Sequence, residues 1–373
     1  MEVVISGYYG FDNVGDEAIL LSIIEVLRNE FPFISITVLS NQPQKTSEQY
    51  GVKAVNRWSF KEVMKAIKKS DGVISGGGGL LQDKTGILSV SYYCGVMWFA
   101  HLLKKPFFVY AQGIGPIKYR FNKQLVANTL KKAALITVRD DISKQFIEQI
   151  GVTNDIYVVP DPVIGLNVEK MISSNWLMNN LDDSDFIVVT VRYWKKGTHY
   201  LERIASGLDS AMKNNHHKIV FIPMHGYEDY LCSLEVKSKM SKEVQHNIYI
   251  VPPDLSIQEK ASIIGSSQLL IGMRLHSLIF AAIKLIPFIS ISYDQKIDVF
   301  TEVCGQKNIG NVETLSWDSS ALTKEIDDCI SSNGLLKENI SLYIGEARKN
   351  TDFTAIKVFK QLLIQRVYGS LTN

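Results

Sequence analysis

The chain has 373 residues, of which 46% are hydrophobic and 21% charged. This composition excludes a mainly disordered chain, which needs low hydrophobicity and a large net charge. Forty Lys and Arg against 38 Asp and Glu leave a net charge of +2, without the basic excess typical of a nucleic-acid binder. No nucleic-acid partner is therefore expected, and the length predicts two domains.

Four cysteines are far apart and form no Cys-x-x-Cys pair, which excludes a disulfide framework and a zinc-finger spacing. We expect a reducing, cytoplasmic compartment. The first seven residues read as a buried strand and not as a signal peptide. Residues 87–103 are apolar but number only 17 and include Ser89, Ser91 and His101. They predict a buried core helix, with a membrane-associated helix as the alternative.

Short apolar runs alternate with helical patterns, which is typical of a parallel sheet covered by helices. In the first part of the chain the predicted strands are 3–6, 35–39, 72–75, 107–110, 135–138 and 156–159. The predicted helices between them are 16–29, 60–69 and 122–132, in addition to 87–103.

The pattern changes near Pro160, where a polar stretch predicts a linker over 166–184. A second series then predicts strands 187–191, 218–222, 248–251, 269–271 and 288–291, and helices 200–214, 257–264, 277–285 and 298–304. The tail 342–368 is predicted to be helical. The domains are therefore 1–165 and 185–345, and 346–373 is expected to pack back on the first.

These two series predict an α/β fold with two Rossmann-like, doubly wound domains facing a central cleft. Ligands in such sheets lie beyond the carboxyl ends of the strands. The loops that follow strands are therefore the expected positions of a site.

The first loop, Gly7–Glu17, is rich in glycine and acidic residues. It has neither the Gly-x-Gly-x-x-Gly of a dinucleotide site nor the Gly-Lys-Ser/Thr of a phosphate loop. Asp16 is predicted to cap the following helix. The carboxylates favour a loop that faces sugar hydroxyls over a plain tight turn.

Two further glycine-rich loops follow strands. Ser75–Asp83 holds four consecutive glycines, which suit either close backbone approach to a ligand or close packing of two segments. Asp83 is a candidate hydroxyl acceptor or general base. In Ala111–Pro116, Gln112 is a candidate ligand contact, and a structural turn is equally consistent with that sequence.

Arg139, Arg192 and Arg274 each stand just after a predicted strand. A single arginine there is commonly a structural ion pair. Three of them facing one cleft favour an anionic ligand, because a guanidinium matches carboxylate and phosphate bidentately.

Arg274-Leu275-His276-Ser277 is the sharpest local motif, because a buried strand ends there and a helix begins. The first turn of a helix offers free N–H groups to an anion. His276 is the favoured catalytic histidine, and His225 is its only rival. Asp183-Ser184-Asp185 lies in the polar linker, so no metal site is predicted.

In combination, Gly7–Glu17, Gly76–Asp83, Ala111–Pro116, Val138–Asp141 and Met273–Ser277 resemble the polysaccharide pyruvyl transferase family. The similarity extends from the first strand to about Phe300. It is greatest to the bacterial enzymes that pyruvylate secondary cell-wall polymers, the ligands of S-layer proteins. That family in turn resembles GT-B glycosyltransferases.

The resemblance implies phosphoenolpyruvate as donor and a saccharide as acceptor, with pyruvate attached as a cyclic ketal and no cofactor. Arg139, Arg274 and His276 match catalytic positions of the family. The expected donor contacts are Arg139, Arg192, Arg274, Leu275, His276, Ser277 and Lys296. The expected acceptor contacts are Tyr8, Asn13, Asp16, Glu17, Gly78, Asp83 and Gln112. Gln295 stands where relatives often have proline.

Two other functions stay open at this stage: a GT-B glycosyltransferase that uses a nucleotide sugar, and a non-catalytic saccharide-binding protein. No acidic base-and-ribose motif follows Arg274, and sugar binding alone needs no cluster of cations. The subgroup suggests N-acetylmannosamine on a lipid-linked intermediate as acceptor. Lys65, Lys68 and Lys69, or Lys118 and Arg120, would then meet the inner membrane face, with a solvated charged surface as the alternative. The number of subunits is not readable from the residues.

Overall fold

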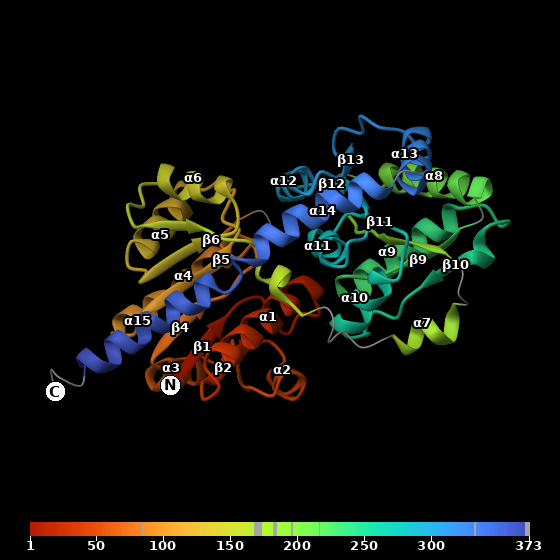
Figure 1. Ribbon diagram of the computed structural model, residues 1–373. Coiled ribbons are helices and arrows are strands. Elements are labelled where there is room, and N and C mark those ends of the chain that lie inside the picture. The colour runs from red at the N-terminus through yellow and green to blue at the C-terminus, as the bar shows by residue number, and fades with distance from the viewer. Residues whose placement is uncertain are drawn as a thin grey trace. The chain divides into compact units, whose positions relative to one another are not determined.

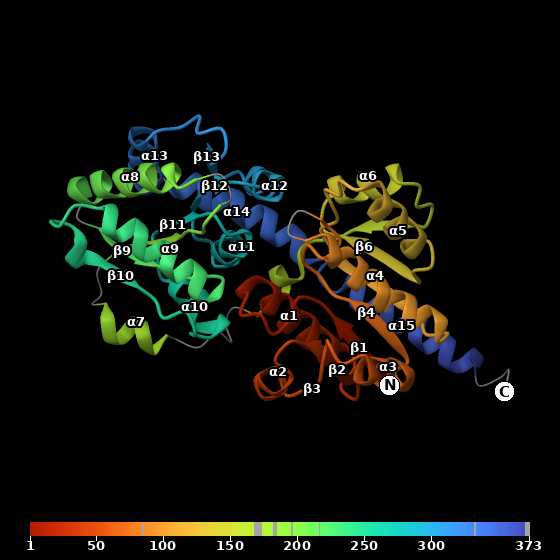
Figure 2. The same ribbon diagram turned by 180° about the vertical axis from the view of Figure 1, so that it is seen from behind.

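The computed structural model describes residues 1–83, 86–167, 174–181, 185–194, 197–215, 217–331 and 333–369. The chain divides into two compact units. Unit 1 is Met1–Leu166 with Ala347–Asn373, and unit 2 is Asn167–Glu346. The predicted Asp183-Ser184 stretch and much of the predicted linker lie outside the described residues. Each unit is an α/β domain built on one parallel sheet (Figures 1 and 2).

Unit 1 holds a seven-stranded sheet in the order β3-β2-β1-β4-β5-β6-β7, and its strand pairs are parallel. The strand order reverses between β1 and β4, which makes the carboxyl ends of these two strands the expected ligand position. The strands are β1 Glu2–Ser6, β2 Ser35–Ser40, β3 Lys53–Asn56, β4 Gly72–Ser75, β5 Phe107–Gln112, β6 Leu135–Val138 and β7 Ile156–Val158.

Helices cover both faces of this sheet. They are α1 Val14–Glu30, α2 Pro43–Tyr50, α3 Phe60–Lys69, α4 Ile87–Leu102, α5 Arg120–Leu130, α6 Asp141–Gln149 and α15 Phe353–Gly369. α3, α4 and α5 pack in a row on one face, whereas α1 and α15 pack together on the other (Figures 1 and 2). Such coverage explains why the central strands are almost wholly apolar.

The apolar segment at residues 87–103 is α4, a helix of the core, as predicted. Val90, Cys94 and Met97 are fully buried in the cluster that packs against β4 and β5. No helix in the described part of the chain is both long enough and apolar enough to cross a membrane. The four cysteines are free and buried.

The tail differs from the prediction of one continuous helix, because residues 349–352 interrupt it. α14 (Asn333–Arg348) packs in unit 2, where Tyr343 contacts Phe300 with ring centroids 5.9 Å apart. α15 packs in unit 1, where Thr354 Oγ1 donates to Thr137 at 3.1 Å and Phe359 stacks on Phe31. The chain thus passes through unit 2 and completes unit 1 at its end.

Unit 2 holds a six-stranded parallel sheet in the order β10-β9-β8-β11-β12-β13. Its strand order reverses between β8 and β11. The strands are β8 Phe186–Thr190, β9 Lys218–Phe221, β10 Ile248–Ile250, β11 Leu269–Gly272, β12 Phe288–Ser292 and β13 Lys307–Asn311. The helices are α7 Asn175–Asn180, α8 His199–Asn215, α9 Gly226–Lys239, α10 Ile257–Gly265, α11 Leu275–Ile283, α12 Gln295–Val303 and α13 Ser319–Ser331, followed by α14.

Candidate functional site

The switch point of unit 2 gathers the sequence-predicted cations. Arg192 follows β8, Arg274 follows β11, and Lys296 lies in the first turn of α12, directly after β12. β8 and β11 are neighbours in the sheet, and so are β11 and β12. Because parallel strands end at one edge, these side chains share the ligand side of the sheet.

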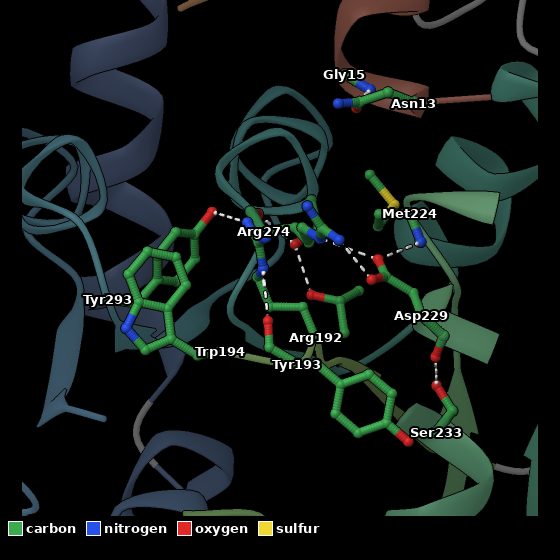
Figure 3. Close-up of polar contacts among 12 residues, drawn as sticks. Asn13, Gly15, Arg192, Tyr193, Trp194, Met224, Asp229, Ser233, Arg274 and Tyr293 are labelled. Carbon is green, nitrogen blue, oxygen red and sulfur yellow. Dashed lines mark hydrogen bonds and ion pairs between the residues drawn. The ribbon is translucent and has the colours of Figure 1, made fainter. Parts of the chain in front are cut away.

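Arg274 forms a bidentate ion pair with Asp229, a residue of α9. Its Nε donates to Asp229 Oδ2 at 2.9 Å, and a terminal nitrogen donates to the other carboxylate oxygen. The Asp229 side chain has no solvent exposure, and it also accepts the backbone N–H of Met224 at 3.2 Å (Figure 3). Arg274 therefore forms a structural ion pair. From the sequence, such a pair is the common alternative to binding an anionic ligand for an arginine that follows a strand.

Arg192 points the other way, towards Tyr293 (Figure 3). One terminal nitrogen donates to the Tyr293 hydroxyl at 2.9 Å, and Nε donates to the Tyr193 carbonyl at 3.3 Å. Its guanidinium carbon lies 4.6 Å from the Tyr293 ring centroid and 5.4 Å from that of Trp194. Among the described residues no carboxylate pairs with Arg192 or with Lys296. Their charges remain available to an anion.

The positive charges at this edge of the sheet lower the pKa of the Tyr293 phenol. It is 7% exposed, and the Lys296 ammonium lies 6.0 Å from its ring centroid. Burial raises the pKa of the Tyr293 phenol, but the charges of Lys296, Arg192 and Arg274 and the hydrogen bond from Arg192 lower it below 10.0 overall. Three cations therefore act on one buried phenol at this edge of the sheet.

α11 begins at Leu275, with Arg274 as the residue that precedes its first turn. Leu275 and His276 thus supply two of the N–H groups that a helix start leaves without intrahelical partners. His276 is half-buried. Ser277 differs from the prediction: its side chain is fully buried, with Oγ 2.7 Å from Thr190 Oγ1 and donating to the Arg274 carbonyl at 2.6 Å. We do not keep its hydroxyl as a donor contact.

His225, the rival histidine, directly precedes α9 and so follows β9 in the same unit. Burial lowers the pKa of its imidazole, and the charges of Arg274 and Arg192 lower it further. A histidine whose pKa is lowered carries a smaller protonated fraction at neutral pH than an ordinary histidine does.

In unit 1 the loop after β1 packs closely against the loop after β4. A Cβ on Gly7 would lie 2.2 Å from the Tyr9 ring, and one on Gly76 would lie 2.1 Å from the Tyr9 hydroxyl. Gly78 has a φ of +91° and lies against the Asp16 carboxylate. Close packing thus accounts for these glycines.

The expected cap of α1 is corrected by the structure. Asn13, not Asp16, precedes the first turn, and its Oδ1 accepts the Gly15 N–H at 3.0 Å. Asp16 lies within the first turn and is half-buried. Tyr8 is partly exposed and stacks on Phe11, with ring centroids 4.2 Å apart.

Three expected acceptor contacts prove to be internal. Glu17 accepts from the Gly10 N–H and the Tyr50 hydroxyl, each at 2.7 Å; its pKa is raised, because burial outweighs these hydrogen bonds. Gln112 is fully buried, and its amide group donates to Ser75 and to Gly76.

Asp83 is 7% exposed and binds the start of α5 by accepting the N–H groups of Lys118 and Tyr119. Burial raises its pKa, but these hydrogen bonds and one from Asn122 lower it overall. We therefore withdraw Glu17 and Asp83 as acceptor contacts, and Asp83 as a general base, because their carboxylates already serve the loops. Gln112 is withdrawn because its side chain is fully buried.

Arg139 belongs to unit 1. Its Nε lies 3.5 Å from Asp140 Oδ2, and a terminal nitrogen lies 3.5 Å from Asp161 Oδ2. Its guanidinium covers Gly113, where a Cβ would lie 2.5 Å from the nearest nitrogen. The side chain is only 9% exposed.

Sequence reasoning missed Asp229 and gave Tyr293 no role. Asp229 lies 45 residues from its partner Arg274, in a stretch without a motif. Tyr293 carried a usable signal, since it follows a buried strand and stands three residues before Lys296.

Solved structures with this fold include several enzymes of sugar metabolism. HepE of Anabaena, solved with UDP and glucose, has a TM-score of 0.65 at 10% identity, over 97% of this chain and 99% of that one. The UDP-GlcNAc 2-epimerase of Neisseria meningitidis, bound to UDP-GlcNAc, has a TM-score of 0.67 at 12% identity, over 98% of this chain and 100% of that one. A Rickettsia africae glycosyltransferase has a TM-score of 0.65 at 15% identity, over 97% of this chain and 98% of that one. At such identities the likeness establishes the GT-B-like fold alone.

A sequence profile narrows the family. The profile of the polysaccharide pyruvyl transferases matches residues 13–295, which include the second and third glycine-rich loops, Arg139 and the Arg274–Ser277 motif. The chain therefore belongs to the polysaccharide pyruvyl transferase family.

Proposed function

We propose that this transferase moves the pyruvyl group of phosphoenolpyruvate onto two hydroxyls of a saccharide as a cyclic ketal and releases phosphate. One observation carries the donor assignment: among the residues that the structure describes, Arg192 and Lys296 have no carboxylate partner, and they share this edge of the sheet with the ion-paired Arg274 that precedes α11. Phosphoenolpyruvate has a carboxylate and a phosphate that carries a charge of about −1.5 to −2 by analogy with phosphoserine. Unpaired cations at a helix N-terminus suit such a ligand.

Each residue has a defined part in this proposal. Arg192 and Lys296 neutralise the anionic groups of the donor, and the N–H groups of Leu275 and His276 donate hydrogen bonds to its oxygens. Arg274 contributes its remaining donors while Asp229 fixes its orientation. Arg139, which belongs to unit 1, enters through the family resemblance.

The reaction needs a proton at C3 of phosphoenolpyruvate, because only then does C2 become electrophilic. One acceptor hydroxyl forms the first C2–O bond, and its proton passes to the imidazole that protonated C3, which restores the acid. The C2–O bond to phosphate breaks, the second hydroxyl closes the ring, and its proton leaves with phosphate or solvent. We assign the proton transfer to C3 to His276. His225 is the poorer candidate because its lowered pKa leaves a smaller fraction of its imidazole protonated, and a positioned acid typically contributes about 10²–10⁴-fold.

The acceptor binds to unit 1 in this proposal, at loops that include Tyr8, Asn13, Asp16 and Gly78. N-acetylmannosamine, carried on a lipid-linked cell-wall precursor at the cytoplasmic membrane face, is the acceptor that the family resemblance favours. The protein needs no metal or cofactor for these steps, because phosphoenolpyruvate itself carries the activated group.

A thermal-shift titration tests the donor. A ligand that binds only the folded protein raises its melting temperature, so phosphoenolpyruvate is expected to stabilise the wild type. Arg192→Met and Lys296→Met should each reduce the shift, and Lys337→Met, an exposed lysine of α14, is the matched control. Stabilisation by a UDP-sugar but not by phosphoenolpyruvate would overturn the proposal in favour of a nucleotide-sugar glycosyltransferase.

A further inference from the structure

Unit 1 has a second polar feature that the donor site does not use, a buried arginine surrounded by aromatic rings. Arg57 follows β3 and is 5% exposed. One terminal nitrogen donates to the Gly7 carbonyl at 2.7 Å, and the other donates to the Tyr93 hydroxyl at 3.3 Å. Within the described part of the chain no carboxylate pairs with it, and its Nε is buried without a partner.

Aromatic faces take the place of that carboxylate. The guanidinium carbon of Arg57 lies 4.3–5.5 Å from the ring centroids of Phe11, Trp58, Tyr92 and Tyr93. Cations over aromatic faces are stabilised electrostatically. Arg57 thereby fixes the positions of rings from three separate segments: the loop after β1, the loop after β3, and α4.

The outer rings of this cluster reach solvent and are nevertheless held in place. Trp58 is 63% exposed, yet its indole N–H donates to Asn41 Oδ1 at 2.9 Å and its ring lies 5.6 Å from that of Tyr92. Phe11, which lies 5.1 Å from the Arg57 guanidinium carbon, is stacked on Tyr8 at an interplanar angle of 6°. An exposed tryptophan fixed at one edge and packed on one side presents a rigid apolar surface to solvent.

The loops around these rings end in polar groups. Asn41 follows β2, and Asp12 and Asn13 follow β1, so the cluster lies at the carboxyl edge of the sheet. Asp12 is half-exposed, and its carboxylate pairs with Lys45 at 2.6 Å. The oxygens of these polar groups already accept hydrogen bonds or form an ion pair within the loops. The exposed ring faces are therefore what this edge offers to a ligand with an apolar face.

We infer that the cluster of Tyr8, Phe11, Trp58 and Tyr92 around Arg57 is a binding site for the pyranose ring of a saccharide. One face of a pyranose carries C–H groups, which pack on the electron-rich face of an aromatic ring. Under the proposed function, on which this step rests, the site holds the acceptor sugar. Arg57 is a positioning residue, since its charge is buried beneath the rings and reaches no ligand.

Saturation-transfer NMR with N-acetylmannosamine, without phosphoenolpyruvate, tests the site directly. The C–H protons of one sugar face should receive saturation in the wild type and lose it in Trp58→Ala, with the sugar dissociation constant raised roughly 3- to 10-fold. Trp58 is exposed, so this variant is expected to fold. Phe33→Ala is the control, because Phe33 is 96% exposed but lies before β2, at the opposite edge of the sheet.

Further measurements separate this inference from its rivals and from the proposed function. Stabilisation by phosphoenolpyruvate should be unchanged in Trp58→Ala, so failure of that stabilisation in the wild type would count against the donor assignment alone. Sugar binding that is unaffected by Trp58→Ala would overturn the inference. The inference would also be overturned if the protein bound N-acetylmannosamine 1-phosphate but not the neutral sugar, and if salt weakened that binding. Such behaviour indicates recognition of charge. The inference would also be overturned if Trp58→Ala lost binding to anionic phospholipid vesicles but still bound the sugar. That result would assign the rings to a membrane surface.

Discussion

Nε of Arg274 donates to a carboxylate oxygen of Asp229 at 2.9 Å, and the Asp229 side chain has no solvent exposure. The pair joins the end of β11 to the first turn of α9. It also compensates the charge of Arg274 before any ligand arrives. Arg192 and Lys296 therefore carry more of the free positive charge at this edge than the most conspicuous arginine of the sequence motif.

Arg274→Met should destabilise unit 2 strongly, because it leaves the Asp229 carboxylate buried without its partner. Removing one member of a buried ion pair typically costs about 3–5 kcal/mol. Urea unfolding should show a much lower midpoint for this variant, whereas Arg192→Met should stay within about 1 kcal/mol of the wild type. Equal stability of the two variants would mean that the Asp229 pair is not the main constraint on Arg274, and loss of activity in Arg274→Met could then be read as a catalytic effect.

Asp83→Asn should lower stability in a pH-dependent way. The Asp83 pKa is lowered in the folded protein, so its carboxylate contributes stability that is fully present above the ordinary pKa of an aspartate. That stability is lost as the pH falls through the folded pKa. Because hydrogen bonds to charged groups contribute about 1.5–3 kcal/mol, the variant should be less stable than the wild type at pH 7 by an amount in that range.

The difference between Asp83→Asn and the wild type should shrink as the pH is lowered below about 4, the usual aspartate value. Urea unfolding at neutral and acidic pH measures it. A variant that keeps full stability at pH 7 but loses turnover would instead restore Asp83 as a candidate base.

Tyr293 should ionise below the ordinary tyrosine value of 10.0, because Lys296, Arg192 and Arg274 favour its phenolate. Tyrosinate absorbance against pH, compared between the wild type and Tyr293→Phe, isolates this one phenol. Arg192→Met and Lys296→Met should each move its midpoint upward. In the window between the folded pKa and 10.0 the unfolded chain holds more protons, so stability rises with pH there. A wild-type midpoint above 10.0 would show that burial dominates over the three cations.

The central strands were predictable because they are covered on both faces and therefore read as continuous apolar runs. The edge strands β3 and β13 were missed because they lack this coverage and so contain no continuous apolar run. β3 reads Lys-Ala-Val-Asn and β13 reads Lys-Asn-Ile-Gly-Asn, and neither contains a fully buried residue. A strand with one free edge and partial exposure has no composition that distinguishes it from a loop.

The site was predictable where a residue's place along its own strand decides its role. Arg192 and Arg274 follow strands, and this alone brings them to the ligand edge. The sequence cannot tell whether a loop carboxylate faces inward or outward, so Glu17 and Asp83 were assigned to an acceptor although both serve their loops. Arg57 escaped notice because its significance lies in four rings from separate segments, which only the fold brings together.

Gly113→Ala provides a test of Arg139 that leaves the arginine itself in place. The new Cβ would lie 2.5–2.8 Å from three guanidinium atoms, which is too close for a real contact. The Arg139 side chain must then shift, which disturbs its 3.5 Å contacts with Asp140 and Asp161. Because a side-chain end can shift more easily than backbone, we expect a stability loss of only about 1 kcal/mol. Gly79→Ala is the matched control, since a Cβ there meets nothing within 4 Å.

If Arg139 acts on the donor, Gly113→Ala should lower kcat/KM for phosphoenolpyruvate by roughly tenfold or more, since a misplaced group in an active site can cost about 10²-fold. The acceptor KM should change little. Gly79→Ala should leave both parameters unchanged. Wild-type kinetics in Gly113→Ala, with the guanidinium shown by a crystal structure to have moved, would reduce Arg139 to a partner of its two carboxylates and leave the donor chemistry to the cations of unit 2.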